Sequence, residues 1–212
     1  MKPKAIFFDV DGTIIPLKVV VRNFQETCKH FNLRVLSGKE ILSNTIGLKL
    51  TEAIRITLPE AIPIEKEFIE YFEDNQIKNF KKYSKLLPYV NSSFKKIKKR
   101  KIKIGIVTTK RRREALAILK GYKLPYDTLV GNDDVKNRKP HPEPVFKACK
   151  KLKVKPKNCV FVGDTSFDMG AAKSAGCLAV GVLTGGGNRK NLKNSGADYI
   201  IKDLRGLIKL LR

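Results

Sequence analysis

The sequence lacks any apolar run that approaches the roughly 20 residues a helix needs to cross a bilayer. It also starts without the apolar stretch of a secretory signal peptide, because a short strand pattern begins at Ala5. Internal repeats and low-complexity segments are missing as well. These absences predict a cytoplasmic protein that has no membrane partner.

Cysteine is scarce and is never closely paired. The four cysteines are far apart and include no Cys-x-x-Cys pair, so neither a zinc site nor a disulfide framework is predicted. We expect reduced thiols that are mostly buried. They are Cys28, Cys149, Cys159 and Cys177.

Acidic residues are few beside basic ones: 20 Asp and Glu against 44 Lys and Arg, a formal net charge of +24. Such a surface would attract a nucleic-acid backbone, and it would equally draw small anions toward an enzyme. The excess positive charge could also come simply from solvated lysines on the surface. Arginine, which makes most base-edge and bidentate phosphate contacts, is the minority cation. Charge alone therefore leaves the function open.

What the sequence does contain is an alternation of short apolar runs and amphipathic helical segments. With 212 residues, 42% of them hydrophobic, the chain can build a sizeable core. The alternation predicts an α/β fold with a doubly wound, mostly parallel, Rossmann-like sheet. The expected strands are residues 5–8, 102–107, 127–130, 160–162, 178–182 and 199–201.

The segment between the first two expected strands differs from the rest. Residues 17–84 contain apolar residues at helical spacing and no clear strand pattern. We expect a small all-helical domain inserted after the first strand, with its aromatic residues in its own core. The predicted domains are residues 1–16 with 85–212 for the α/β core and residues 17–84 for the helical insertion.

The first strand runs into two carboxylates, Asp9 and Asp11, followed by Gly12. Residues i and i+2 of a strand share a face, so both carboxylates can reach one cavity at the strand end. Carboxylates this close repel each other unless a cation or a proton lies between them. Asp and Gly are also ordinary turn residues, so a plain strand-to-turn junction is the alternative.

Other polar residues follow later strands of the expected sheet. Thr108 and Asp164 end two of them, and ligands of such sheets bind at the carboxyl ends of the strands. Lys139 stands in a proline-rich turn. Carboxylates suit a hard cation such as Mg²⁺, while a hydroxyl and an ammonium suit phosphoryl oxygens. One aspartate could attack phosphorus while the other moves a proton.

These segments together resemble the haloacid dehalogenase superfamily, in its phosphoglycolate phosphatase-like branch with a helical cap. Each motif is weak alone, but four in the family's order are specific, and they cover nearly the whole core. The segment 47–53 resembles a cap segment of that branch. The four motifs are Asp9–Thr13, Val107–Thr109, Lys139–Pro142 and Gly163–Asp168.

The resemblance implies a catalytic role for each matching residue. Asp9 would be the nucleophile that forms an aspartyl-phosphate, and Asp11 the general acid/base. Thr108, helped by the backbone amide of Thr109, would bind the phosphoryl oxygens. Lys139 would neutralise the charge of both the nucleophile and the phosphoryl group.

The resemblance also implies Mg²⁺ as the cofactor. Asp9 and Asp164 would bind it directly, and Asp11 would bind it through its backbone carbonyl. Asp168 would hold a metal-bound water or Lys139, or else serve only as an acid at a helix N-terminus. The partner would be a small phosphorylated metabolite, here a phosphomonoester such as a phosphoglycolate-like compound or a sugar phosphate.

Several alternatives stay open at this point. The segment Val107–Lys110 also resembles the pyrophosphatase members of the branch. A β-phosphoglucomutase-like enzyme is less favoured, because that group has an arginine where Leu50 stands here. From other classes, a basic nucleic-acid-binding protein on a phosphatase scaffold would bind DNA in a salt-sensitive way without turnover. A pure scaffold protein would not hydrolyse an aryl phosphate with or without magnesium.

Two further segments receive structural interpretations. Residues 110–113 follow the second expected strand. They could contact an anionic substrate or simply cover a helix start, and we favour solvated cations at the helix start. Residues 185–187 are three glycines without the lysine of a P-loop, so we expect a flexible loop near the site.

Overall fold

The computed structural model describes residues 2–45 and 47–211, and the chain divides into two compact units. One unit is Met1–Pro16 with Leu86–Arg212, and the other is Leu17–Lys85. The first boundary, after Pro16, is where the sequence placed it. The second boundary, after Lys85, lies one residue later than expected.

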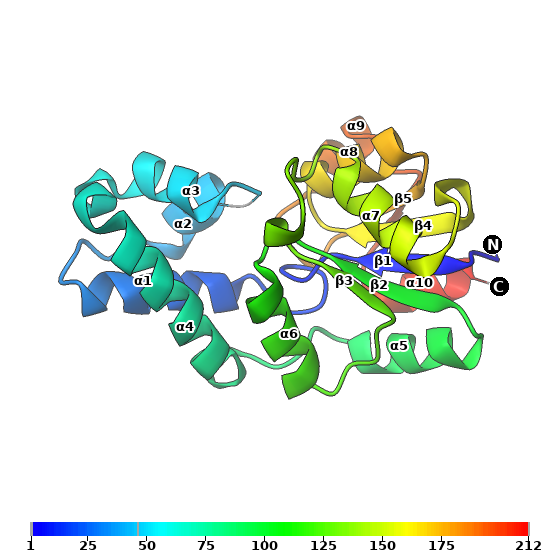
Figure 1. The fold of residues 1–212 in the computed structure, drawn as a ribbon, viewed down its shortest axis with the longest axis horizontal. Helices are drawn as coiled ribbons and strands as arrows, with labels where there is room; N and C mark the ends of the chain where they lie inside the picture. The colour runs from blue at the N-terminus through cyan, green and yellow to red at the C-terminus, as the bar shows by residue number, and fades with distance from the viewer. Residues whose placement is uncertain (1, 46, 212) are drawn as a thin grey trace. The chain divides into compact units, whose positions relative to one another are not determined.

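The first unit is built on a six-stranded sheet in which every neighbouring pair is parallel. The strand order β3-β2-β1-β4-β5-β6 places the first strand in the middle of the sheet (Figure 1). This is the predicted doubly wound α/β fold. The strands are β1 (Ala5–Phe8), β2 (Lys103–Val107), β3 (Thr128–Val130), β4 (Cys159–Gly163), β5 (Leu178–Val182) and β6 (Tyr199–Ile201).

Helices cover both faces of this sheet because the central strands are apolar on both sides. Ala5 and Phe7 of β1 belong to the core cluster formed with α7 and α8. Phe8, which points the other way, packs against Phe94 of α5 with ring centroids 4.7 Å apart. The helices of this unit are α5 (Val90–Lys99), α6 (Arg112–Gly121), α7 (Glu143–Leu152), α8 (Ser166–Ala175), α9 (Arg189–Asn194) and α10 (Leu204–Leu210), with short 3-10 turns at Asn132–Asp134 and Pro156–Asn158.

The second unit is all-helical over its described residues, as expected. Its own core contains Phe24, Phe68 and Phe72, with the Phe24 ring centroid 5.5 Å from that of Phe68. The regularly spaced aromatic side chains of this segment therefore pack together in its own core. The elements are α1 (Lys18–His30), α2 (Gly38–Thr45), α3 (Leu50–Thr57), a 3-10 helix (Pro59–Ile64) and α4 (Glu65–Tyr83).

Two of the absences in the sequence have structural counterparts. Within residues 2–45 and 47–211, no helix is both long and apolar enough to span a membrane. The four cysteines are buried free thiols, as expected from their spacing. The Sγ atoms of Cys149 and Cys159 lie 4.0 Å apart within the core of the first unit.

Candidate active site

Asp9 directly continues the central strand. Its backbone N–H donates to the carbonyl of Val162 in β4, at 3.0 Å, so the residue keeps the register of the sheet. The chain then turns sharply. Gly12 has a φ of +76°, and a Cβ at this position would collide with the carboxylate of Asp164. Glycine is therefore needed where the chain passes between the ends of β1 and β4.

Lys139 joins two carboxylates in the interior of the first unit. Its Nζ donates to Oδ1 of Asp9 at 2.8 Å and to Oδ1 of Asp168 at 2.5 Å. A third contact runs to the carbonyl of Val107, at 3.4 Å. Burial lowers the pKa of Lys139, but the carboxylates of Asp168 and Asp9 raise it by more, so the side chain is an ammonium ion.

Asp168 contacts both Lys139 and the start of α8, which are two of the positions considered for it from sequence. Its Oδ2 accepts hydrogen bonds from the backbone N–H and the hydroxyl of Thr165, at 3.0 Å and 2.6 Å. This is the capping box of α8, which fixes the carboxylate at the helix start. The other oxygen holds Lys139. Asp168, held in place by the capping of α8, thus positions the lysine that contacts Asp9.

Asp164 follows β4 and is completely buried. Its Oδ1 accepts from the hydroxyl of Thr13 at 3.2 Å, and its Oδ2 accepts from the N–H of Gly186 at 2.8 Å. A Cβ on Gly185 would collide with the same carboxylate. The glycine loop therefore packs tightly against Asp164, and the expectation of a flexible loop missed this close approach.

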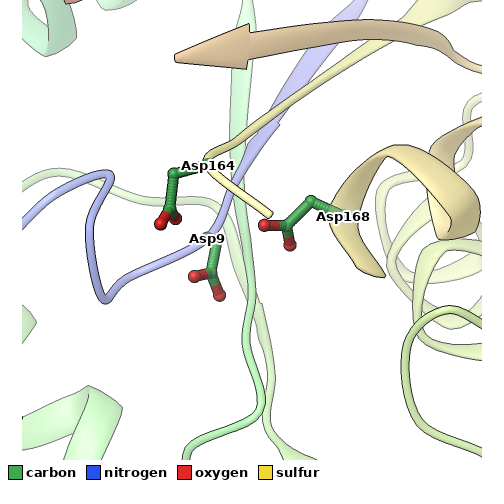
Figure 2. A group of neighbouring side chains, drawn as sticks. All are labelled: Asp9, Asp164 and Asp168. Atoms are coloured by element: carbon green, nitrogen blue, oxygen red, sulfur yellow. The ribbon is translucent and has the colours of Figure 1, made fainter. Parts of the chain in front are cut away.

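Three carboxylates lie together at this end of the sheet. Figure 2 shows the side chains of Asp9, Asp164 and Asp168 gathered there. One oxygen from each lies within 4.8 Å of the other two. Burial raises the pKa of the Asp9 carboxyl to about 6 despite the opposing ammonium of Lys139. Burial, with Asp168 and Asp9 beside it, also raises the pKa of Asp164 well above its usual value.

The donor set of this cluster fits a hard divalent cation. If all three carboxylates are ionised, the ammonium of Lys139 offsets only one of their charges. Oxygen ligands close together, with excess negative charge, match the preferences of Mg²⁺. The predicted direct ligands Asp9 and Asp164 are both in the cluster, and Asp168 is its third member. The side chain of Asp11 points to a different partner.

Thr108 follows β2 as Asp9 follows β1. The register pairs Phe8 with Ile106, so the two strands end side by side at the same edge of the sheet. Thr108 is buried, and its Oγ1 accepts from the N–H of Lys110 at 3.3 Å. Thr109 is half-buried. The expected phosphate-binding residues thus lie at the edge of the sheet that carries the acids.

Lys110 is buried, whereas a solvated side chain was expected from sequence. Its side chain is only 7% exposed, and its Nζ lies 3.0 Å from Oδ2 of Asp11. On the other side, Glu114 Oε1 is 3.9 Å away. Burial lowers the pKa of Lys110, but Asp11 and Glu114 raise it by more. The position of Lys110 in the sequence could have predicted this contact. It comes two residues after Thr108, at the edge of the sheet where the strands end.

Comparisons with known proteins show what the chain is similar to. The family model for haloacid dehalogenase-like hydrolases matches residues 6–182. Pyrophosphatase PpaX of Oceanobacillus iheyensis is 30% identical over 215 residues, covering 100% of this chain and 98% of that protein. Phosphoglycolate phosphatase of Mannheimia succiniciproducens is 26% identical over 223 residues, covering 98% of each.

The fold is also similar to solved structures. One, described as a predicted phosphoglycolate phosphatase from Haemophilus somnus, superimposes with a TM-score of 0.89 at 26% identity. That match covers 100% of this chain and 99% of the other.

Proposed function

Since this chain belongs to the haloacid dehalogenase-like hydrolase family, we propose that it is a magnesium-dependent phosphatase that hydrolyses a small phosphomonoester. The observation that carries the proposal is the buried ion-pair cluster in which Lys139 bridges Asp9 and Asp168 beside Asp164. A strand-end carboxylate held by an ammonium, with further acids around it, suits attack on a negatively charged phosphoryl group.

Asp9 is the nucleophile in this proposal. Lys139 holds its Oδ1, which leaves Oδ2 to form the bond to phosphorus as the bond to the leaving oxygen breaks. Asp11 protonates the leaving oxygen. It then accepts a proton from the water that attacks phosphorus, which releases phosphate and restores Asp9. Thr108 and the backbone amide of Thr109 donate to the phosphoryl oxygens.

Asp9 and Asp164 would hold Mg²⁺ directly, with Asp11 contributing its backbone carbonyl. The bound cation would offset the charge of the carboxylates and of the phosphoryl oxygens. Asp168 keeps Lys139 in place from the other side of the site. Thr13 and Gly186 orient Asp164 through its two oxygens.

The helical unit Leu17–Lys85 is proposed to be the cap that selects the substrate. The proposed partner is a small phosphorylated metabolite. A second candidate activity is the hydrolysis of inorganic pyrophosphate, because relatives that are 30% identical over nearly their whole length are named pyrophosphatase PpaX. In that reaction Asp9 would attack one phosphorus of pyrophosphate, and phosphate would be the leaving group.

The test is phosphate release by the purified protein from phosphoglycolate, sugar phosphates, pyrophosphate and p-nitrophenyl phosphate, each with magnesium and with EDTA. We expect magnesium-dependent release from at least one monoester, and the preferred compound decides between the two activities. Equal release in EDTA would remove the metal from the proposal. No release from any of them, together with salt-sensitive DNA binding, would support the nucleic-acid-binding alternative.

A further inference from the structure

Lys110 makes a close ion pair with the carboxylate to which the proposal above gives the proton transfers. Its Nζ lies 3.0 Å from Oδ2 of Asp11, and the lysine side chain is 7% exposed. A lysine on the surface would lose much rotamer entropy on forming such a pair, whereas a buried one is already confined. The buried Lys110 therefore loses little further freedom when it pairs with Asp11, which is itself only partly exposed.

Several contacts determine where the Lys110 ammonium lies. Its backbone N–H donates to Oγ1 of Thr108 at 3.3 Å, which ties the residue to the end of β2. Glu114, one turn into α6, places Oε1 at 3.9 Å from Nζ. The other oxygen of Glu114 accepts from the N–H of Arg111 at 3.0 Å, which ties this carboxylate to the start of α6. Strand end and helix start thus aim the lysine at Asp11.

The two oxygens of Asp11 have different surroundings. Oδ2 is occupied by Lys110. Oδ1 is buried and has no hydrogen-bond partner among residues 2–45 and 47–211. A buried oxygen without a partner is costly, and such atoms concentrate where function requires them. The pair therefore leaves one defined oxygen of Asp11 available to exchange a proton.

We propose that Lys110 is a positioning residue that fixes Asp11 through Oδ2, so that Oδ1 is the atom that gives and takes the proton. The inference rests on the proposed phosphatase activity and adds a residue to it. Lys110 itself does not touch the phosphoryl group. Its effect should therefore depend on how much the leaving oxygen needs a proton.

The experiment compares Lys110→Met with the native enzyme on two kinds of monoester. Alkyl phosphates have a strongly basic leaving oxygen that needs protonation, whereas p-nitrophenolate leaves without it. Because kcat/KM reports only the steps up to release of the leaving group, it isolates the first proton transfer. We expect a drop of about 10- to 100-fold in kcat/KM for an alkyl phosphate, as for a misplaced catalytic group. For p-nitrophenyl phosphate we expect less than about a threefold change, since little protonation is needed.

Arg112→Met is the matched control. Arg112 also carries a cation at the start of α6, but it pairs with Asp134 at 3.1 Å. Its removal should change kcat/KM only slightly, and by the same factor for both substrates. Lys110→Arg should recover part of the alkyl phosphate activity, because a cation can still reach Asp11. Inhibition by inorganic phosphate should be unchanged in Lys110→Met, which separates positioning of Asp11 from binding of the substrate anion.

A double-mutant cycle shows whether Lys110 acts through Asp11. In an Asp11→Asn background, Lys110→Met should cost no further alkyl phosphate activity. A full additional loss, or an equal loss on both kinds of substrate, would overturn the inference. If Lys110→Met fails to fold, Lys110→Met with Glu114→Gln removes the second buried charge and is measured in the same way. A native enzyme without phosphatase activity would instead contradict the proposed function.

Discussion

Two buried lysines in the first unit each lie between two carboxylates, but their surroundings differ. Lys139 contacts Asp9 and Asp168 at 2.8 Å and 2.5 Å, and Asp164 adds a third carboxylate beside them. Lys110 contacts Asp11 at 3.0 Å and approaches Glu114 at 3.9 Å.

The difference separates charge neutralisation from proton transfer. The Lys139 cluster keeps excess negative charge, which suits a cation and a nucleophile that attacks phosphorus. The Lys110 cluster leaves Oδ1 of Asp11 without a hydrogen-bond partner in the described part of the chain, which suits a group that carries a proton. Two similar ion-pair motifs at the same edge of the sheet can thus support different chemical steps.

The largest effect should come from Asp9→Asn. The amide cannot form the phosphoenzyme, so kcat should fall by at least about 10⁴-fold, as when a nucleophile is removed from other hydrolases. Phosphate release in the steady state measures it. Asp198→Asn, which removes a surface carboxylate paired with Lys173, is the control and should keep its rate. A near-native rate for Asp9→Asn would exclude Asp9 from the mechanism.

Replacing Lys139 should affect every substrate alike, unlike replacing Lys110. Lys139→Met removes charge stabilisation at the nucleophile, and we expect a loss of about 10²- to 10³-fold in kcat/KM for aryl and alkyl phosphates. It also leaves Asp9 and Asp168 buried without their shared cation, which costs about 3–5 kcal/mol of unfolding free energy when a buried pair is broken. Urea unfolding measures the second effect. If Lys139→Met lowered kcat/KM only for alkyl phosphates, Lys139 and Lys110 would not have the different roles proposed here.

Magnesium should stabilise the folded protein through the carboxylates beside Lys139 and not through the carboxylate of Asp11. A cation that binds only the folded state adds about 2.7 kcal/mol at one hundred times its Kd, so Tm should rise with magnesium. EDTA should reverse the rise. Asp164→Asn removes a cluster ligand and should abolish it, whereas Asp11→Asn should retain it. An unchanged Tm shift in Asp164→Asn would place the metal elsewhere.

The smallest effect should come from the glycine loop. Gly185→Ala inserts a methyl group against the Asp164 carboxylate, and such overpacking costs about 1–3 kcal/mol. It should also weaken the magnesium-dependent Tm shift. Gly176→Ala is the control, because Gly176 has a φ of +78° but no atom of residues 2–45 or 47–211 lies within 4 Å of the added Cβ. It should cost about 1 kcal/mol through the backbone alone and leave the magnesium response intact.

Much of the fold and part of the site could be predicted from sequence because their signals are local. Apolar runs bounded by turns identified the strands, and parallel strands bring their carboxyl ends to one edge. Asp9, Thr108 and Asp164 could therefore be assigned to one site. Asp168 was ambiguous because a helix-capping acid and an ion-pair partner have the same local sequence, and the structure uses it as both.

The remaining parts depend on contacts between distant segments. The direction of Lys110 could not be read from a loop that has no periodicity, so a solvated cation was expected. The tight packing of Gly185 is visible only once Asp164, 21 positions earlier, lies against it. The described residues of the segment 17–84 are helical, as predicted, but the spacing of its apolar residues indicates packing and says nothing of the substrate.

The most direct test of the account is a rapid acid quench of the enzyme during turnover of phosphorus-labelled p-nitrophenyl phosphate. Asp11→Asn is the best variant for it, because this substrate needs no proton to form the phosphoenzyme, while the water attack that follows is slowed. We predict label on the protein that hydroxylamine releases and that peptide mapping assigns to Asp9. Turnover without labelled protein, or label on another residue, would contradict it.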